Sequence, residues 1–187
     1  METTRRNKIV ALYPGGFKPP HVGHFLSAKY LENYPNINEI RVIISPQERT
    51  DKSGKIIVSA KQSLAIWNIF LNGNNKIKAT ISASPSPVRE VYDLMKQMSS
   101  GDTLLFLKGE KETDEDKRFQ RAEEWAKKNN LNINVKQVIT KVSHEFQNIS
   151  ASFLRELIAN NKMNEFMTFL PKHLSSEDKQ RIWGDTY

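Results

Sequence analysis

The chain alternates short apolar runs with amphipathic stretches, and this alternation constrains its fold more than any other feature. Five apolar runs are predicted to be strands, at 8–13, 39–45, 77–82, 102–108 and 133–140. Helical patterns separate them, at 21–34, 59–71, 87–98 and 115–130. Strands that alternate with helices through short links form a parallel sheet with right-handed crossovers. We therefore predict an α/β fold, a five-stranded parallel sheet with helices on both faces.

Beyond residue 140 the apolar period becomes helical, and no further strand is predicted. Three short helices are expected, at 149–161, 163–170 and 175–183, with breaks at Asn160-Asn161 and Pro171. Ser59 stands three residues before Gln62, the spacing of a capping box, and predicts a helix start there. The polar link 47–55 carries no recognisable pattern, so we predict no regular structure for it.

Composition and charge narrow the possible partners. No apolar run approaches the roughly 18–20 residues that span a bilayer, so we expect no membrane insertion. The chain has no cysteine, which excludes disulfides and thiolate metal sites, and we expect a cytoplasmic protein. Its formal net charge of +7 favours anionic partners such as nucleotides and phosphate esters. The cations are spread along the chain, which argues against a dedicated nucleic-acid-binding protein.

Residues 13–25, YPGGFKPPHVGHF, join the first predicted strand to the first predicted helix. Ligands of parallel sheets bind beyond the carboxyl ends of the strands, so this loop is placed to line a site. Gly15 and Gly16 leave room for a ligand beside the backbone. The helix is expected to begin near His21, with free first-turn amides that attract anions. His21 and His24 are three residues apart, so both imidazoles project from one side of that turn and can donate to phosphate oxygens.

Two plainer interpretations of the histidines stay open. They could form part of a zinc site, although the other two histidines, His144 and His173, show no ligand spacing. They could also be structural residues that start a helix and bind nothing. Two common phosphate-binding loops, G-x-x-x-x-G-K-[ST] and G-x-G-x-x-G, do not follow the first strand.

The loop closely resembles the G-x-F-x-P-x-H-x-G-H signature of the nucleotidyltransferase superfamily related to cytidylyltransferases. All six fixed positions are kept: Gly15, Phe17, Pro19, His21, Gly23 and His24. The family's second motif, I-S-x-[ST]-x-x-R, is matched by Ile149, Ser150, Ser152 and Arg155. The resemblance spans residues 8–171 and includes SPQER at 45–49 and FLP at 169–171. It implies a Rossmann-like nucleotidyltransferase core over residues 1–148 and a C-terminal helical segment over 149–187.

The second motif also has a physical reading without the family. Either Ser150 or Ser152 can cap the helix that follows, and either hydroxyl can donate to a phosphate. Arg155, further along that helix, can present a forked cation to a triphosphate. Taken alone, the segment is equally an ordinary capped helix with a surface arginine.

The resemblance implies transfer of a nucleoside monophosphate from a nucleoside triphosphate to a phosphate-monoester acceptor, with release of pyrophosphate. The preferred pair is ATP with nicotinamide mononucleotide, because His21 stands where phosphopantetheine enzymes usually have Thr. The alternatives within the family are a phosphopantetheine adenylyltransferase and a cytidylyltransferase for a phosphorylated alcohol. Alternatives from another class are a nucleic-acid-binding protein and a non-catalytic relative. A homo-oligomer is left open.

The same resemblance assigns roles to individual residues. The expected catalytic residues are His21, His24 and Arg155. Mg²⁺ is expected to bind through the substrate phosphates, with no metal ligand from the protein. The expected nucleotide- and phosphate-binding residues are Tyr13, Gly15, Gly16, Phe17, Lys18, Gly23, Gly109, Ser150 and Ser152.

Three residues are candidates for binding the acceptor: Lys18, Arg49 and Lys111. Family members often have Asp, Asn or Gln in place of Lys18, so this lysine either binds the acceptor phosphate or replaces a solvated polar side chain. Arg49 is the candidate for a lysine that relatives often carry just past the second strand. Gly109, Lys111 and the acidic run at 110–116 follow the fourth strand, in the region that lies near base and ribose in adenylyltransferases of the family.

Overall fold

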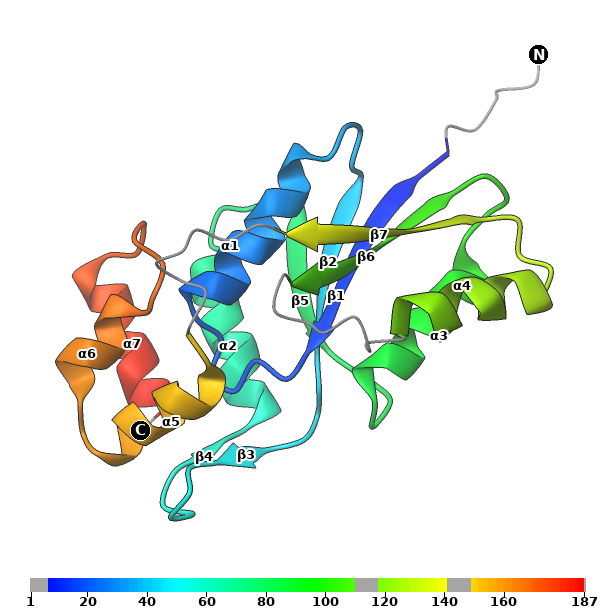
Figure 1. Cartoon of the computed structure of the whole chain (residues 1–187). Coiled ribbons are helices and arrows are strands. Elements are labelled where there is room, and N and C mark those ends of the chain that lie inside the picture. The colour runs from blue at the N-terminus through cyan, green and yellow to red at the C-terminus, as the bar shows by residue number, and fades with distance from the viewer. Residues whose placement is uncertain (1–6, 110–117, 141–148, 187) are drawn as a thin grey trace.

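The computed structural model describes residues 7–109, 118–140 and 149–186 (Figure 1). Its centre is a five-stranded parallel sheet in the order β5-β2-β1-β6-β7. The strands are β1 (Ile9–Gly15), β2 (Glu39–Ile44), β5 (Ile77–Ile81), β6 (Thr103–Gly109) and β7 (Asn134–Thr140). These are the five strands that the apolar runs predict. The predicted fold class is confirmed.

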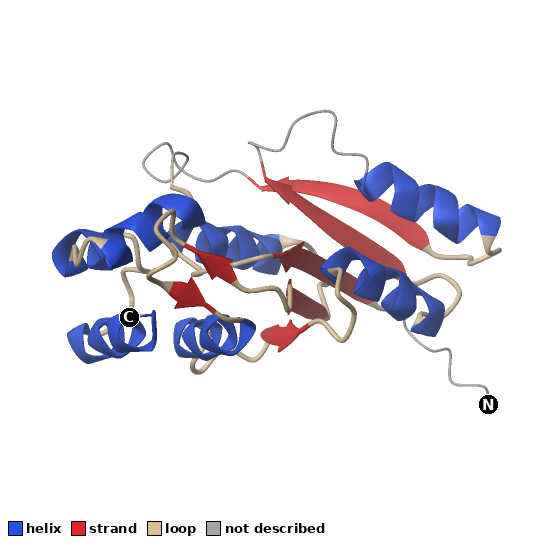
Figure 2. Cartoon of the chain, turned by 90° about the horizontal axis from the view of Figure 1, so that it is seen from below, coloured by secondary structure: helices blue, strands red, loops and turns tan. Residues whose placement is uncertain are grey.

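Helices lie on both sides of the sheet (Figure 2). They are α1 (Val22–Tyr30), α2 (Ala60–Phe70), α3 (Pro87–Gln97), α4 (Arg118–Lys128), α5 (Ala151–Ala159), α6 (Met163–Thr168) and α7 (Ser176–Thr186). A short 3₁₀ helix, Leu31–Asn33, extends α1. The predicted capping box is present, because Ser59 Oγ accepts from the Gln62 amide and Gln62 Oε1 from the Ser59 amide. Within the described ranges, no helix is both long and apolar enough to cross a membrane.

The sheet separates two hydrophobic clusters, because successive residues of a strand point to opposite faces. Ala11 of β1 belongs to the larger cluster and Leu12 to the smaller one. The larger cluster gathers side chains from α1, α2 and the C-terminal helices, including Leu154, Phe166 and Ile182. The smaller cluster gathers α3 and α4. The C-terminal helices therefore share the core of the sheet.

The link after β2 is structured, and the prediction of no regular structure at 47–55 is wrong. Two short antiparallel strands, β3 (Arg49–Thr50) and β4 (Ile57–Val58), form a hairpin. Asp51 is buried and closes the loop between them, accepting from the amides of Ser53 at 2.9 Å and Ile56 at 2.6 Å. The hydrogen bond from the Ser53 hydroxyl, and then those from the backbone amides, lower the pKa of the Asp51 carboxyl. A single aspartate thus shapes a polar stretch that lacks any apolar alternation.

Candidate functional site

The carboxyl ends of all five strands meet at one edge of the sheet, and the loop after β1 lies there. Phe17 anchors this loop: it is buried and has a left-handed backbone, with φ of 53°. Its ring meets Tyr13, His24 and Trp67 edge-on, at centroid distances of 5.0, 4.9 and 5.4 Å. Ser63 Oγ donates to the Phe17 carbonyl at 2.6 Å. The loop is therefore held at its centre by an aromatic cage and by one hydroxyl from α2.

Three consecutive backbone amides of this loop have no hydrogen-bond partner in the part of the chain that the structure describes. Within the described ranges, the N–H groups of Gly16, Phe17 and Lys18 make no hydrogen bond to the protein. Successive unpaired N–H groups beside a left-handed residue form a concavity that attracts anions. The loop thus offers main-chain donors.

The two histidines stack on each other at the start of α1, with centroids 3.6 Å apart and an interplanar angle of 23°. His21 is the N-cap, and its Nδ1 accepts from the Gly23 amide at 3.0 Å. His24 Nδ1 accepts from the His21 amide at 3.2 Å. Because both Nδ1 atoms are acceptors, each neutral ring carries its proton on Nε2. Burial, and then the neighbouring His21, lower the pKa of His24 well below its usual range. His24 is therefore a neutral hydrogen-bond donor near pH 7.

The expectation of free amides in the first turn of α1 is wrong. The Val22 amide donates to the Phe169 carbonyl at 2.8 Å, and His21 caps the Gly23 amide. The physical reason is that His21 is itself the capping residue, while the FLP stretch closes over the helix start. Anion-binding donors at this edge therefore come from the loop rather than from the helix.

Lys18 is a buried cation held by main-chain carbonyls. Its side chain is 1% exposed, so the interpretation as a solvated polar residue is wrong. Nζ donates to the Gly16 carbonyl at 2.6 Å and to the Ser45 carbonyl at 2.8 Å. Burial, and then the nearby Arg49, lower the pKa of Lys18 to about 8. The ammonium thus ties the loop after β1 to the end of β2.

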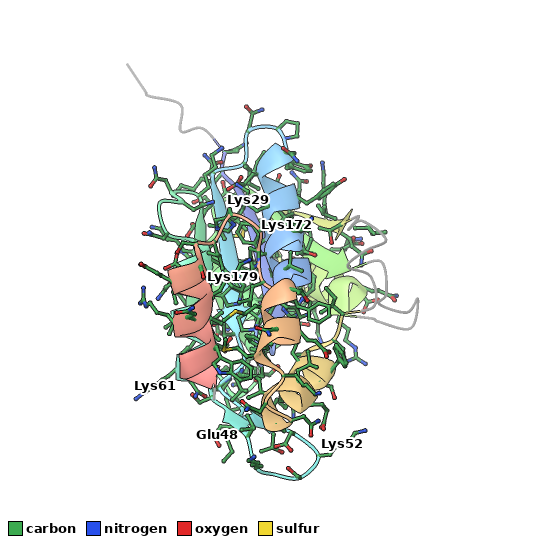
Figure 3. All side chains as sticks on the ribbon, turned by 90° about the vertical axis from the view of Figure 1, so that its left-hand side faces the viewer. Lys29, Glu48, Lys52, Lys61, Lys172 and Lys179 are labelled. Carbon is green, nitrogen blue, oxygen red and sulfur yellow. The ribbon has the colours of Figure 1, made fainter. Side chains whose placement is uncertain are left out.

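Arg155 links the second motif to the first. Its Nη1 donates to the Lys18 carbonyl at 2.7 Å, and its Nε donates to the Thr50 carbonyl of β3 at 2.9 Å. The next residue, Glu156, accepts from the Lys52 amide at 2.9 Å. The β3–β4 hairpin is therefore fastened to α5, while the Lys52 side chain points outward from it (Figure 3).

Lys18, Arg49 and Arg155 form a cationic cluster at this edge. In the described part of the chain, no carboxylate lies within ion-pair distance of any of them. The nearby acids, Asp51 and Glu156, accept from backbone amides instead. Burial, and then Arg49, lower the pKa of Arg155, whose guanidinium still stays charged at neutral pH. The charges of Glu156 and Asp51 act in the opposite direction on the pKa of Arg155, so they offset part of the positive charge of the cluster.

The positions of Ser150, Ser152 and Gly109 do not test the roles predicted for them. Ser150 is the N-cap of α5 and accepts from the Phe153 amide at 3.1 Å, whereas Ser152 is exposed in the first turn. Gly109 ends β6 and pairs with Thr140. Lys111 and the acidic run at 110–116 lie outside the described residues. The phosphate-binding and acceptor-binding roles of all these residues stay predictions.

Three residues that shape the site were missed by the sequence reasoning. Ser63 holds the Phe17 carbonyl, Ser45 receives the Lys18 ammonium, and Asp51 forms the hairpin. Ser45 opens the SPQER stretch but was given no role, and no motif marks Ser63 or Asp51. Each of the three acts through a contact with backbone that is distant or irregular. Over the described ranges, no group of three or more His, Asp or Glu side chains is arranged to hold a metal ion.

Comparison with known proteins places the fold. No protein-family profile matches the chain, and no curated protein sequence matches it significantly. Two solved structures of the Plasmodium falciparum nicotinic acid mononucleotide adenylyltransferase, complexed with NaAD and with APC, are similar. Each has a TM-score of 0.52 and 14% identity, over 89% of this chain and 92% of that one. The chain shares their fold.

A third similar structure is Thermotoga maritima TmcAL bound with alpha-thio ATP. It has a TM-score of 0.54 and 11% identity, over 95% of this chain and 55% of the TmcAL chain. At these identities the likeness is one of fold. It agrees with the five-stranded parallel sheet described above.

Gly15→Ala tests whether Phe17 anchors the loop. A Cβ at Gly15 would lie 2.8 Å from the Phe17 ring, whereas a Cβ at Gly16 would meet nothing within 4 Å. We expect Gly15→Ala to lower the free energy of unfolding by about 1–3 kcal/mol, because the ring must leave its cage. Gly16→Ala is the matched control, expected within about 0.5 kcal/mol of wild type. Urea unfolding measures both, and equal effects would contradict the anchoring role.

Proposed function

We propose that this chain is a nucleotidyltransferase that moves AMP from ATP to a pyridine mononucleotide such as nicotinamide mononucleotide. The observation that carries the proposal is the convergence of three kinds of anion-binding group on one edge. These are the stacked histidines, the amides of the loop after β1 and the cations Lys18, Arg49 and Arg155. Among the described residues, those amides make no hydrogen bond and those cations no ion pair. The structural neighbours add support, since one is a nicotinic acid mononucleotide adenylyltransferase and another was solved with an ATP analogue.

In the proposed reaction, an acceptor phosphate oxygen attacks the α-phosphorus of ATP. The new P–O bond forms as the bond to the β-phosphate oxygen breaks, and pyrophosphate leaves with the electron pair. Such transfers depend on positioning and charge stabilisation rather than on a covalent intermediate. Mg²⁺ would arrive with the triphosphate, held by phosphate oxygens, and would neutralise part of its charge.

Different residues of the chain contact different phosphate groups in the proposed reaction. The amides of Gly16 and Phe17 bind phosphate oxygens, and the Nε2–H of His24 donates to the α-phosphate as charge moves to the leaving group. Arg155 holds the β- and γ-phosphates, because its remaining N–H groups are not spent on carbonyls. Arg49, exposed on β3, is the candidate for the acceptor phosphate.

A substrate panel tests the proposal. Purified protein is incubated with magnesium, each of the four nucleoside triphosphates, and a set of phosphate monoesters. The set includes nicotinamide mononucleotide, nicotinic acid mononucleotide, phosphopantetheine and glycerol phosphate. We expect pyrophosphate release with ATP and a pyridine mononucleotide. Release with another pair would favour the phosphopantetheine or cytidylyl alternative. Nucleotide binding without release for any pair would overturn the catalytic proposal.

His24→Ala is expected to reduce turnover by on the order of 100-fold, as loss of one positioned donor to developing charge does. The matched control is His173→Ala, because His173 is exposed and bonds the Phe70 carbonyl away from the strand ends. Steady-state kinetics of the pair identified by the panel measures both variants. Unchanged turnover in His24→Ala would remove this histidine from the chemistry.

Lys18 predicts a pH dependence of nucleotide binding. Its pKa of about 8 in the free protein means that it loses its proton as the pH rises through that value. A bound triphosphate favours the charged ammonium, so affinity should fall about tenfold between pH 7 and pH 9. Arg stays protonated over this range, so Lys18→Arg should remove the decline. Lys18→Met should bind more weakly and also without a decline.

Isothermal titration with magnesium nucleotide at constant ionic strength measures these affinities. A decline of equal size in Lys18→Arg and Lys18→Met would assign the titration to another group.

A further inference from the structure

A second cationic surface lies between α3 and α4, on the face of the sheet opposite α1 and α2 (Figure 1). The two helices enclose an open hollow of about 500 Å³, which we call the α3–α4 groove. Eight side chains line it: Arg89, Tyr92, Asp93, Lys96, Arg121, Glu124, Trp125 and Lys128. Four of these are cations and two are acids, so the groove carries excess positive charge.

The two helices present the same order of side chains along the groove. Helix α3 places Tyr92 between Arg89 and Lys96, and α4 likewise has an aromatic residue between two cations. In each helix the outer cations are seven residues apart, which at 1.5 Å per residue is about 10 Å. Both helices follow strands of one parallel sheet, so they run side by side in the same direction. The groove therefore has aromatic rings at its centre and cations at both ends.

The aromatic pair is held in place, whereas three of the cations have no bonding partner among the described residues. Tyr92 and Trp125 lie with ring centroids 5.2 Å apart, and Lys96 Nζ lies 5.7 Å from the Trp125 ring. Among the described residues, the side chains of Arg89, Arg121 and Lys128 make no hydrogen bond or ion pair. These three cations therefore have no anionic partner among the residues that the structure describes.

We propose that the α3–α4 groove binds single-stranded nucleic acid, with a base against Tyr92 and Trp125 and its flanking phosphates on the cations at either end. Single-strand sites combine a positive groove with aromatic side chains on which bases stack. In a strand every base has a phosphate on both sides, which matches a ring pair with cations on both sides. A mononucleotide has phosphate on one side only and would leave one end of the groove unused. The proposal is independent of the reaction proposed above, because the groove lies on another face.

Fluorescence anisotropy of a labelled oligothymidylate or oligouridylate of about ten nucleotides tests the proposal. Measurements run from about 50 to 200 mM salt, with saturating magnesium ATP present so that the site at the strand ends is filled. We expect the logarithm of the binding constant to fall linearly with the logarithm of the salt concentration. Arg89 and Arg121 lie at the same end of the groove and face one phosphate. Neutralising both in Arg89→Gln/Arg121→Gln should therefore reduce that slope by about 0.7, the contribution of one phosphate contact in a single strand.

The ring pair is tested separately by Trp125→Leu and Tyr92→Leu, each expected to weaken binding by roughly tenfold, as loss of one stacked base does. Thermal unfolding identifies any variant that fails to fold. If one of the two variants does not fold, the other still tests the role of the rings. The charge-matched control is Lys61→Gln/Lys179→Gln, which removes two cations from another side of the molecule (Figure 3).

Three outcomes would overturn the proposal. The first is no binding of either oligonucleotide at the lowest salt. The second is an equal loss of slope in the Lys61→Gln/Lys179→Gln control, which would indicate attraction to net charge alone. The third is competition by thymidine monophosphate at the same concentration as the oligonucleotide, which would make the groove a mononucleotide site.

Discussion

The ammonium of Lys18 is the interaction on which the strand-end site depends. It bonds the carbonyls of Gly16 and Ser45, and the Lys18 carbonyl in turn accepts from Arg155. One residue thus joins the end of β1, the end of β2 and helix α5. Because the carbonyl of Gly16 faces the ammonium, the N–H of Phe17 in the same trans peptide points the opposite way. The buried charge therefore orients a main-chain donor toward the outside of the loop.

Such an arrangement is costly without an anion. A buried lysine with no carboxylate partner loses solvation, and its lowered pKa expresses that loss. Arg49 and Arg155 add repulsion at the same edge. Clusters of titratable groups with perturbed pKa values are typical of functional sites. A bound phosphate group supplies negative charge at this edge. The repulsion between cations that destabilises the free protein therefore favours binding of the proposed ligand.

The sequence predicts the sheet well, because its inner strands β2, β1 and β6 are nearly continuous apolar runs, as buried parallel strands are. The edge strands β5 and β7 are half exposed and alternate apolar with polar residues, which is also a strand pattern. The sequence also predicts that the imidazoles of His21 and His24 lie on one side of the first turn, but not that they stack, because His21 is an extended N-cap residue. It does not predict the burial of Lys18 or the role of Ser63, which depend on carbonyls distant in the chain. The hairpin is missed because Asp51, rather than alternating apolar residues, determines its shape. The expectation of free amides in α1 was wrong because the sequence interpretation gave His21 only a ligand-binding role. In the structure His21 caps the helix and accepts from the Gly23 amide.

The fastening of α5 to the hairpin has a thermodynamic consequence. A long arginine side chain usually loses rotamer freedom when it binds a ligand, at about 0.5–1.5 kcal/mol for each side chain immobilised. Arg155 is already fixed by the carbonyls of Lys18 and Thr50. Its five N–H donors leave three for an incoming anion. A phosphate that reaches Arg155 therefore meets a cation whose conformational entropy was lost when the chain folded, and not at the moment of binding.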